Sequence, residues 1–314
     1  MTKVGGIHHI TAIASDPQRC YDFYSKILGL RLVKKSVNQD DTATYHLFFG
    51  DKVGSPGMDL TFFTFSPAYQ GKRGAGVVST ISLAIPAGSL DFWLKRFEKK
   101  KVKHDTVVTE FGHKRVFFYD EDDQRLELVE VSEKELQIVQ RYIWTTKEIS
   151  HKEAIRSLFS ATLNVLQLEL IDDVFTTMGY ELAEKNEQSA LYALPTSAKA
   201  AFIQVDINQL QEPAIGAAGT VHHIAFQVKD EAQELEMRRK IFELGLYPTE
   251  VIDRYYFRSV YFRTKAGILF ELATLGPGFT ADEEESVLGE KLALPPFLED
   301  QRAAIEAGLS RITM

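Results

Sequence analysis

Cysteine is almost absent from this sequence, with Cys20 as its single example among 314 residues. One thiol cannot form an intramolecular disulfide, and it cannot build a zinc or iron–sulfur site that needs several cysteines. Cys20 lies in Pro17–Leu28, a segment with helical periodicity, so we expect a buried structural thiol and not a nucleophile. The sequence therefore excludes both a disulfide scaffold and a multi-cysteine metal cluster.

Long apolar runs and an excess of basic residues are also missing. No stretch approaches the ~20 apolar residues that a membrane-spanning helix needs, and the first residues show no signal-peptide core. We therefore expect a cytoplasmic chain without a membrane partner.

The net charge of -8 argues against a nucleic-acid partner, because phosphate binding needs clustered Lys and Arg. The length and the hydrophobic content of 45% suffice for two domains with a large core.

The most informative pattern is an internal repeat. The segment from Ile7 reads His-His-Ile-Thr-Ala-Ile-Ala, and the segment from Val221 reads His-His-Ile-Ala-Phe-Gln-Val. Each alternating run predicts a strand. An Asp, an amphipathic stretch and Leu-Gly-Leu follow in both segments, which predicts a capped helix that ends near the glycine. Extended runs come next, so each unit reads β-α-β-β-β.

Two weaker copies lie between these segments, and the third copy is the least clear. The four units are expected at residues 5–66, 77–132, 151–207 and 219–275. We predict an α+β fold in which four βαβββ modules form two open β-barrels with the helices outside. The chain would divide into an N-terminal half (1–133), a polar connector (134–150), a C-terminal half (151–276) and a tail (277–314). Within the tail, Pro296–Leu309 is predicted to form one amphipathic helix.

Alternation along the predicted strands indicates which side chains share a face. In Val221–Val228, the apolar residues from Ile224 onward are predicted to pack on a helix. They would share their face with His222, which leaves His223 on the opposite face. His9 has the position of His223 in the first unit.

Glu271 lies in the run Gly-Ile-Leu-Phe-Glu-Leu-Ala-Thr and is predicted to face away from Phe270 and Leu272. An unpaired buried carboxylate is very unfavourable, so this residue needs a cation or strong donors. We therefore predict one metal ion held by His9, His223 and Glu271.

Two imidazoles and one carboxylate leave about three octahedral positions open, an arrangement that suits Fe(II) first and Mn(II) next. Zinc more often has tetrahedral or cysteine-containing sites. One histidine in a strand is ordinarily structural. The signal comes from two His-His-Ile pairs at matching repeat positions together with the acid in the last strand.

The other units serve as an internal control. Thr80 has the histidine position in the second unit, and Thr61 has the Glu271 position in the first. Glu127 in the second unit is a candidate acid without a matching histidine. We therefore expect the first and fourth units to close the metal barrel, and the second and third to form an empty one.

Six sequence blocks resemble one known superfamily over nearly the whole chain. They are Gly6–Thr11, Tyr21–Tyr24 with Leu28–Leu30, Thr44–Gly50, Val221–Phe226, Asp253–Arg263 and Gly267–Glu271. On these blocks the chain resembles the vicinal oxygen chelate superfamily, which includes glyoxalases, bleomycin resistance proteins and extradiol dioxygenases. It is most similar to bacterial ring-cleaving dioxygenases of the hydroquinone type, including relatives linked to quinone resistance.

The resemblance implies Fe(II) at the three ligands, with O2 and a small aromatic compound as substrates. It also implies a second layer of site residues, namely His8, Thr11, His222, Arg254 and Tyr261. His222 or Tyr261 could manage the proton of a phenolic substrate. Arg254 could stabilise negative charge on oxygen or on the ring-opened product.

Three alternative functions fit the superfamily but match the candidate ligands less well. A glyoxalase-type lyase commonly uses four protein ligands, and Thr61 stands where a second Glu would be. A non-enzymatic resistance protein that binds small molecules lacks the full ligand set. A catechol extradiol enzyme commonly takes all its ligands from the later half of the chain, unlike His9 here. The sequence leaves open the ring substituents, thiol-conjugate substrates, iron against manganese, and self-association.

Overall fold

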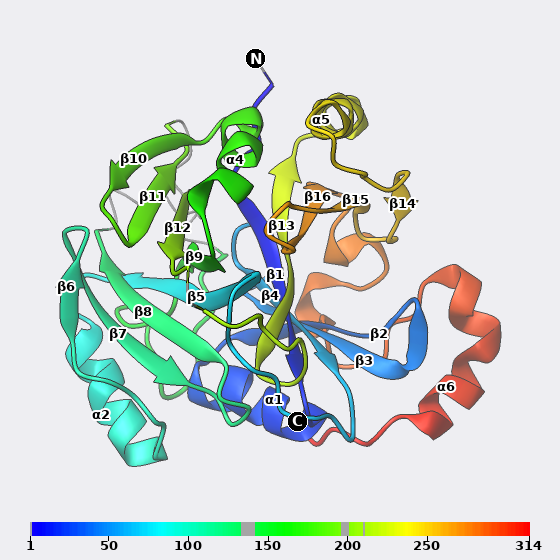
Figure 1. The fold of residues 1–314 in the computed structure, drawn as a ribbon. Coiled ribbons are helices and arrows are strands. Elements are labelled where there is room, and N and C mark those ends of the chain that lie inside the picture. Colours follow the sequence, from blue (N-terminus) through cyan, green and yellow to red (C-terminus); the bar gives the residue numbers. More distant parts are fainter. Residues whose placement is uncertain (1, 133–141, 196–200, 210) are drawn as a thin grey trace.

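The computed structural model of the chain describes residues 2–132, 142–195, 201–209 and 211–314. Among these residues, the strands form two sheets of eight strands each, and the longer helices lie outside the sheets (Figure 1). The predicted α+β class is confirmed. None of the described helices is long and apolar enough to cross a membrane.

All four units follow the predicted β-α-β-β-β order. The first has β1 (Ile7–Ala14), α1 (Pro17–Tyr21), η1 (Asp22–Ile27), β2 (Arg31–Asn38), β3 (Asp41–Gly50) and β4 (Asp59–Thr64). The second has β5 (Val77–Pro86), α2 (Leu90–Lys100), β6 (Val108–Glu110), β7 (His113–Tyr119) and β8 (Arg125–Val131). The third has β9 (Ser157–Val165), η3 (Leu168–Leu170), α4 (Asp172–Met178), β10 (Glu181–Lys185), β11 (Ser189–Ala193) and β12 (Phe202–Ile207). The fourth has β13 (Thr220–Val228), α5 (Glu231–Glu243), β14 (Ile252–Asp253), β15 (Arg258–Arg263) and β16 (Leu269–Thr274).

Each sheet joins two units at their first strands. One sheet has the order β14-β15-β16-β13-β1-β4-β3-β2, and the other has the order β10-β11-β12-β9-β5-β8-β7-β6. The central pairs, β1 with β13 and β5 with β9, are antiparallel. Strands of the first and fourth units therefore share one sheet, called the metal barrel below, and those of the second and third share the other. This topology brings the two His-His-Ile segments side by side.

The central strands contain β-bulges at matching positions. The pairing of β1 with β13 skips His8 and His222, and the pairing of β5 with β9 skips Ser79 and Phe159. A bulge adds one residue to a strand and redirects its side chain. The prediction that His222 shares a face with the apolar residues from Ile224 onward is therefore wrong. Strict alternation fails at the bulge, and His222 is exposed.

The helix starts follow the predicted capping pattern. The side chains of Asp16 and Asp230 accept hydrogen bonds from backbone N–H groups at the starts of α1 and α5. The first helical segment is not uniform, since Pro17–Tyr21 is α-helical and Asp22–Ile27 is π-helical.

The tail differs from the single helix that we predicted. Pro296–Gln301 is a 3₁₀ helix (η6), and Arg302–Gly308 forms a short α-helix (α6). The tail lies beside β2 and β3 (Figure 1). Within it, Asp282 and Glu283 form ion pairs with the fully buried Lys34 of β2. Of the predicted connector 134–150, residues 134–141 lie outside the described residues.

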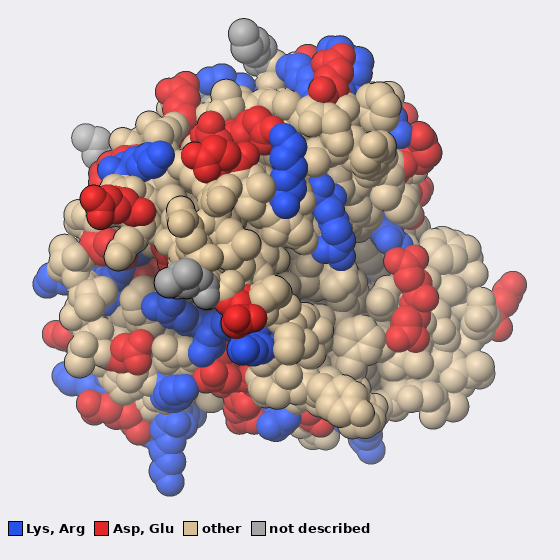
Figure 2. All heavy atoms as spheres, viewed as in Figure 1, with Lys and Arg blue, Asp and Glu red and all other residues tan. Residues whose placement is uncertain are grey.

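Acidic and basic side chains are interspersed over the face that Figure 2 shows. No large basic patch stands out on that face.

The second barrel contains a buried ion pair at the position of the metal site. Glu127 and Arg115 expose 1% and 3% of their side chains, and their closest oxygen and nitrogen are 3.1 Å apart. Ser82 Oγ donates a hydrogen bond of 2.6 Å to the other Glu127 oxygen. Burial raises the pKa of Glu127, while Arg115 opposes this rise. The guanidinium therefore supplies the cation that a carboxylate in this setting requires.

Arg115→Met should lower the free energy of unfolding by about 3–5 kcal/mol, because Glu127 would remain buried without its cation. The double variant Arg115→Met/Glu127→Leu should recover most of this loss, since it also removes the charge. Urea unfolding followed by circular dichroism measures both. Equal destabilisation of the two variants would contradict this explanation.

Candidate metal centre

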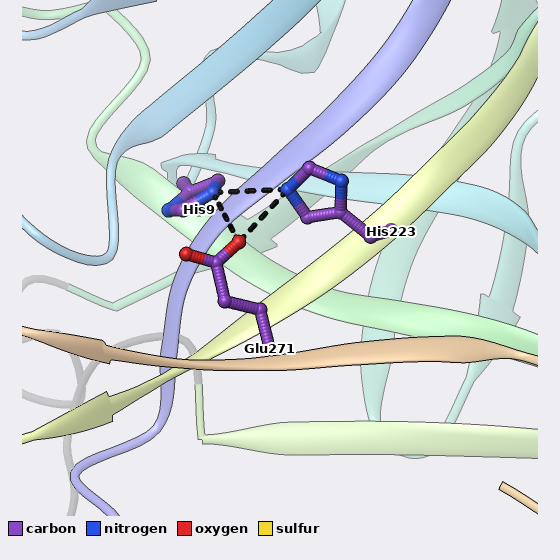
Figure 3. Close-up of side chains that lie close together, drawn as sticks. All are labelled: His9, His223 and Glu271. Carbon is purple, nitrogen blue, oxygen red and sulfur yellow. Dashed lines mark hydrogen bonds and ion pairs between the residues drawn. The ribbon is translucent and has the colours of Figure 1, made fainter. Parts of the chain in front are cut away.

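His9, His223 and Glu271 converge in the metal barrel from three adjacent strands (Figure 3). His9 Nε2 lies 3.3 Å from His223 Nε2 and 3.3 Å from Glu271 Oε2. His223 Nε2 lies 3.0 Å from Glu271 Oε2. All three side chains are buried. The three atoms that face one another are all potential metal ligands.

These separations fit a shared cation. Bonds of about 2.1 Å at right angles place two ligand atoms about 3.0 Å apart. Glu271 Oε2 is a buried oxygen without a hydrogen-bond donor, although two imidazole nitrogens surround it. Burial alone would raise the pKa of Glu271, but His9 and His223 hold it well below its usual range. The carboxylate is therefore ionised and ready to bind a divalent metal.

Ser259 on β15 orients the carboxylate. Its Oγ donates a hydrogen bond of 2.6 Å to Glu271 Oε1, which leaves Oε2 directed at the imidazoles. Ser259 is fully buried. A hydrogen bond to the outer oxygen holds the whole carboxylate in one orientation, so that Oε2 stays aimed at the two imidazoles.

Each ligand histidine has the preceding histidine behind it. The Nδ1 atoms of His8 and His9 are 2.9 Å apart, and those of His222 and His223 are 2.8 Å apart. Burial lowers the pKa of His8 to about 3, and partial burial followed by His223 lowers the pKa of the more exposed His222 to about 4. Both outer rings are therefore neutral at pH 7. Each can accept the Nδ1–H of its neighbour, which leaves the ligand Nε2 atom free for a metal.

A cavity adjoins the ligands. It has about 490 Å³ of empty space, including its open mouth. Its apolar wall consists of Val37, Phe48, Phe63, Tyr256 and Phe257, and its polar wall consists of Ser36, Asn38, Gln39, Asp40, His46, Arg254 and Tyr261. Aromatic walls with a few directed polar groups are typical of sites for small organic molecules.

Arg254 and Tyr261 meet at one side of the cavity. The Arg254 guanidinium forms two contacts with Asp40, of 3.2 and 2.9 Å, and lies 3.4 Å from the Tyr261 hydroxyl. Burial raises the pKa of Tyr261, and Glu271 raises it further. The phenol therefore keeps its proton and can donate a hydrogen bond into the cavity.

The other predicted site residues lie outside the cavity wall. Thr11 is fully buried beside His223, with its Oγ1 2.9 Å from His223 Nε2. His8 is buried behind His9. His222 faces a separate cavity on the far side of His223, which Arg263 also lines. The structure thus places two of the five in the cavity wall and three around the ligands.

Sequence reasoning missed His46 as a member of this wall. It lies on β3 between the rings of Phe48 and Phe63, at centroid distances of 3.9 and 4.4 Å. The block Thr44–Gly50 contains it, and its repeat position corresponds to that of Ser259. Aligning the first unit with the fourth would therefore have placed His46 beside the candidate metal site.

Comparison with known proteins identifies the family. The model for the "Glyoxalase/Bleomycin resistance protein/Dioxygenase superfamily" matches residues 6–128. MhqO of Bacillus subtilis, which is named as a ring-cleaving dioxygenase, is 41% identical over 308 residues, or 98% of this chain and 96% of MhqO. The chain belongs to the ring-cleaving dioxygenase family of this superfamily. A chlorohydroquinone/hydroquinone 1,2-dioxygenase of Sphingobium indicum is 33% identical over 307 residues, covering 95% of this chain and 93% of that protein.

Solved structures agree with this family assignment. The crystal structure of a Bacillus subtilis protein described as a dioxygenase has a TM-score of 0.94 and 40% identity, and it covers 100% of this chain and 99% of its own. Glyoxalase I from Zea mays shares the fold, with a TM-score of 0.63, 15% identity, and coverage of 86% of this chain and 92% of its own. The fold is thus common to a dioxygenase relative and to glyoxalase I.

In this family member, Ser259→Ala should weaken divalent-metal binding about 10–100-fold, because Glu271 loses the donor that orients it. Competition with a chromogenic chelator for Fe(II) under anaerobic conditions measures the affinity. Ser82→Ala is the matched control, since Ser82 donates to the buried carboxylate of the other barrel. Equal affinities of the two variants would show that Ser259 does not support the metal site.

Proposed function

We propose that this protein is a non-haem, Fe(II)-dependent dioxygenase that opens the ring of hydroquinone- or catechol-type aromatics with O2. One observation carries the proposal: the ligand atoms of His9, His223 and Glu271 lie within 3.3 Å of one another beside an aromatic-walled cavity. The relative named as a hydroquinone 1,2-dioxygenase supports the choice of substrate class.

The donor set supports iron as the metal, with manganese as the next choice. Two neutral imidazoles and one carboxylate leave coordination positions open, as in other non-haem Fe(II) oxygenases. A redox-active metal here would couple oxidation of the ring to reduction of O2.

Thr61 argues against a fourth protein ligand of the lyase type. It has the position that corresponds to Glu271, but its hydroxyl lies 2.7 Å from Thr11 Oγ1 and 3.0 Å from His46 Nε2. A neutral hydroxyl held by two neighbours is a poor ligand for a divalent metal. Three protein ligands therefore fit the site better than four.

The cavity provides groups for a phenolic ring. Phe48 and Phe257 offer apolar contact to its faces or edges. Arg254 places a permanent positive charge where negative charge develops on substrate oxygen, and Tyr261 can donate a hydrogen bond there. His222 lies outside the cavity and so cannot contact the substrate. In this proposal it orients His223 through the contact between their Nδ1 atoms.

Protein reconstituted anaerobically with Fe(II) should consume O2 when hydroquinone is added. His9→Ala and Glu271→Ala should each lose bound metal and turnover, since two remaining ligands hold the ion weakly. An oxygen electrode and metal analysis give the two readouts, with catechol and a hemithioacetal as competing substrates. Ser82→Ala, which keeps both charges of the Glu127–Arg115 pair, is the control in the other barrel. Full turnover by Glu271→Ala would refute the ligand assignment, and hemithioacetal turnover without O2 uptake would identify a lyase.

Arg254→Met should lower kcat/KM for hydroquinone about 10²–10³-fold, because charge on the reacting oxygen loses its stabilising cation. Steady-state oxygen uptake measures kcat and KM separately. Arg258→Met removes a guanidinium close by in sequence that pairs with Glu231 at the surface, and it should retain wild-type kinetics. Similar kinetics for the two variants would exclude this role of Arg254.

A further inference from the structure

The tail supplies a second layer of side chains behind the apolar wall of the cavity. Phe48 and Tyr256 line the cavity, and the ring of Phe279 packs against both, at centroid distances of 5.0 and 5.3 Å. Phe279 begins the 3₁₀ helix η4 (Phe279–Ala281) and is 4% exposed. It does not line the cavity itself. Outward movement of either wall ring is therefore opposed by Phe279.

Phe279 is itself closely packed. A Cβ atom added to Gly54, in the loop between β3 and β4, would lie 2.5 Å from the Phe279 ring, so the backbone of that loop packs against the ring. Phe279 also shares one buried apolar cluster with Val33 and Leu288, which are 0% and 2% exposed. Interiors packed this closely yield little. The ring thus fixes the position of the wall residues that it touches.

Tyr256 is held at the wall by two contacts with the tail and one with β2. Its hydroxyl donates a hydrogen bond of 2.8 Å to Asp282 Oδ2, and its backbone oxygen accepts one of 2.8 Å from the Gly278 N–H. Lys34 Nζ lies 4.8 Å from the centre of the Tyr256 ring and 2.7 Å from the other Asp282 oxygen. Rotation of the ring away from the cavity would break its hydrogen bond to Asp282.

The turn that carries Tyr256 has a strained backbone. Tyr255 has a φ of 73°, in the left-handed region that an aromatic residue rarely adopts. The turn places Arg254, Tyr256 and Phe257 in the cavity wall. Strained backbone of this kind persists only where its surroundings hold it in place. The tail contacts to Tyr256 are part of those surroundings.

The corresponding cavity of the second barrel is wider. It has about 1660 Å³ of empty space, including its open mouth, whereas the cavity of the metal barrel has about 490 Å³. Leu191 of the third unit has the position of Phe48, because the two residues pair with Gln204 and Thr61 at matching places in their sheets. Most of the residues in that wider wall are polar. The fold alone therefore does not set the width of a barrel cavity, and the packing of its wall does.

We propose that Phe279 sets the width of the cavity and thereby limits the size of the substituents that a substrate ring can carry. The inference rests on the proposed function, and it makes Phe279 a positioning residue that acts through Phe48 and Tyr256. The volume of about 490 Å³ lies in the lower half of the range of about 300–1,000 Å³ that is usual for ligand sites, so a bulky group on the ring meets the wall. A smaller side chain at position 279 leaves space into which both wall rings can move.

The test compares hydroquinone with tert-butylhydroquinone in the Fe(II)-loaded protein. Isothermal titration calorimetry without O2 gives the two Kd values, and steady-state oxygen uptake gives kcat/KM for each compound. Phe279→Ala should raise the preference for tert-butylhydroquinone over hydroquinone about 10–100-fold in both measurements, because the branched group finds room in the widened cavity. Phe279→Leu, which keeps more of the apolar volume, should raise it less. Phe97→Ala is the matched control, because this fully buried ring lies on α2 in the second unit.

A ratio between two substrates separates this role from a general loss of stability, because a smaller folded fraction lowers both activities equally. Ratios that rise from wild type and Phe97→Ala to Phe279→Leu and then to Phe279→Ala support the inference. If the wild type consumes O2 with hydroquinone while both Phe279 variants keep its ratio, or if Phe97→Ala raises the ratio as much, the inference is wrong and the proposed function stands. If the wild type consumes no O2 with either compound, both proposals fail.

Discussion

A carboxylate that stays ionised inside a β-barrel requires a positive charge or strong donors within contact distance, and the two barrels of this structure meet that requirement differently. Glu271 and Glu127 occupy matching positions in the two barrels, and both are almost fully buried. In the second barrel Arg115 supplies the charge from within the chain. In the metal barrel two imidazoles surround Glu271 Oε2, and neither is a permanent cation. The second barrel therefore neutralises its carboxylate with its own guanidinium. The metal barrel lacks a permanent cation beside Glu271, which suits that site to a metal ion.

The β-bulges determine how the histidine pairs work. In a regular strand, His8 and His9 would point to opposite faces, and so would His222 and His223. The extra residue in each strand brings the Nδ1 atoms of each pair within 2.9 Å. Each ligand ring thus has a neighbour that fixes its orientation. The second barrel has bulges at the same positions but no histidine pairs, so the bulge belongs to the fold and the histidine pairs are particular to the barrel with the candidate ligands.

In the metal barrel, the candidate site lies on firmly paired central strands, and the cavity beside it has both aromatic and polar side chains. The candidate ligands lie on central strands that are paired on both sides, which restricts their movement. The cavity wall is built from β2, β3, β4, β15 and the adjoining loops, which contribute both aromatic and polar side chains. The Arg254–Asp40 ion pair links the fourth and first units at the cavity wall. The ends of the chain therefore cooperate in one site, while the middle of the chain supports it.

The sequence by itself determined the repeat, the α+β class and the three candidate ligands. The repeat and the fold class follow from local periodicity. The candidate ligands follow from the matching histidine pairs and from a carboxylate placed in an apolar run. A single sequence shows all of these features. Tertiary structure decided which faces His8 and His222 adopt, because a bulge arises from the pairing of two strands distant in sequence. It also decided that His46 joins the cavity wall and that Thr11 meets Thr61. Those contacts depend on the register between strands, and local sequence patterns do not specify the register.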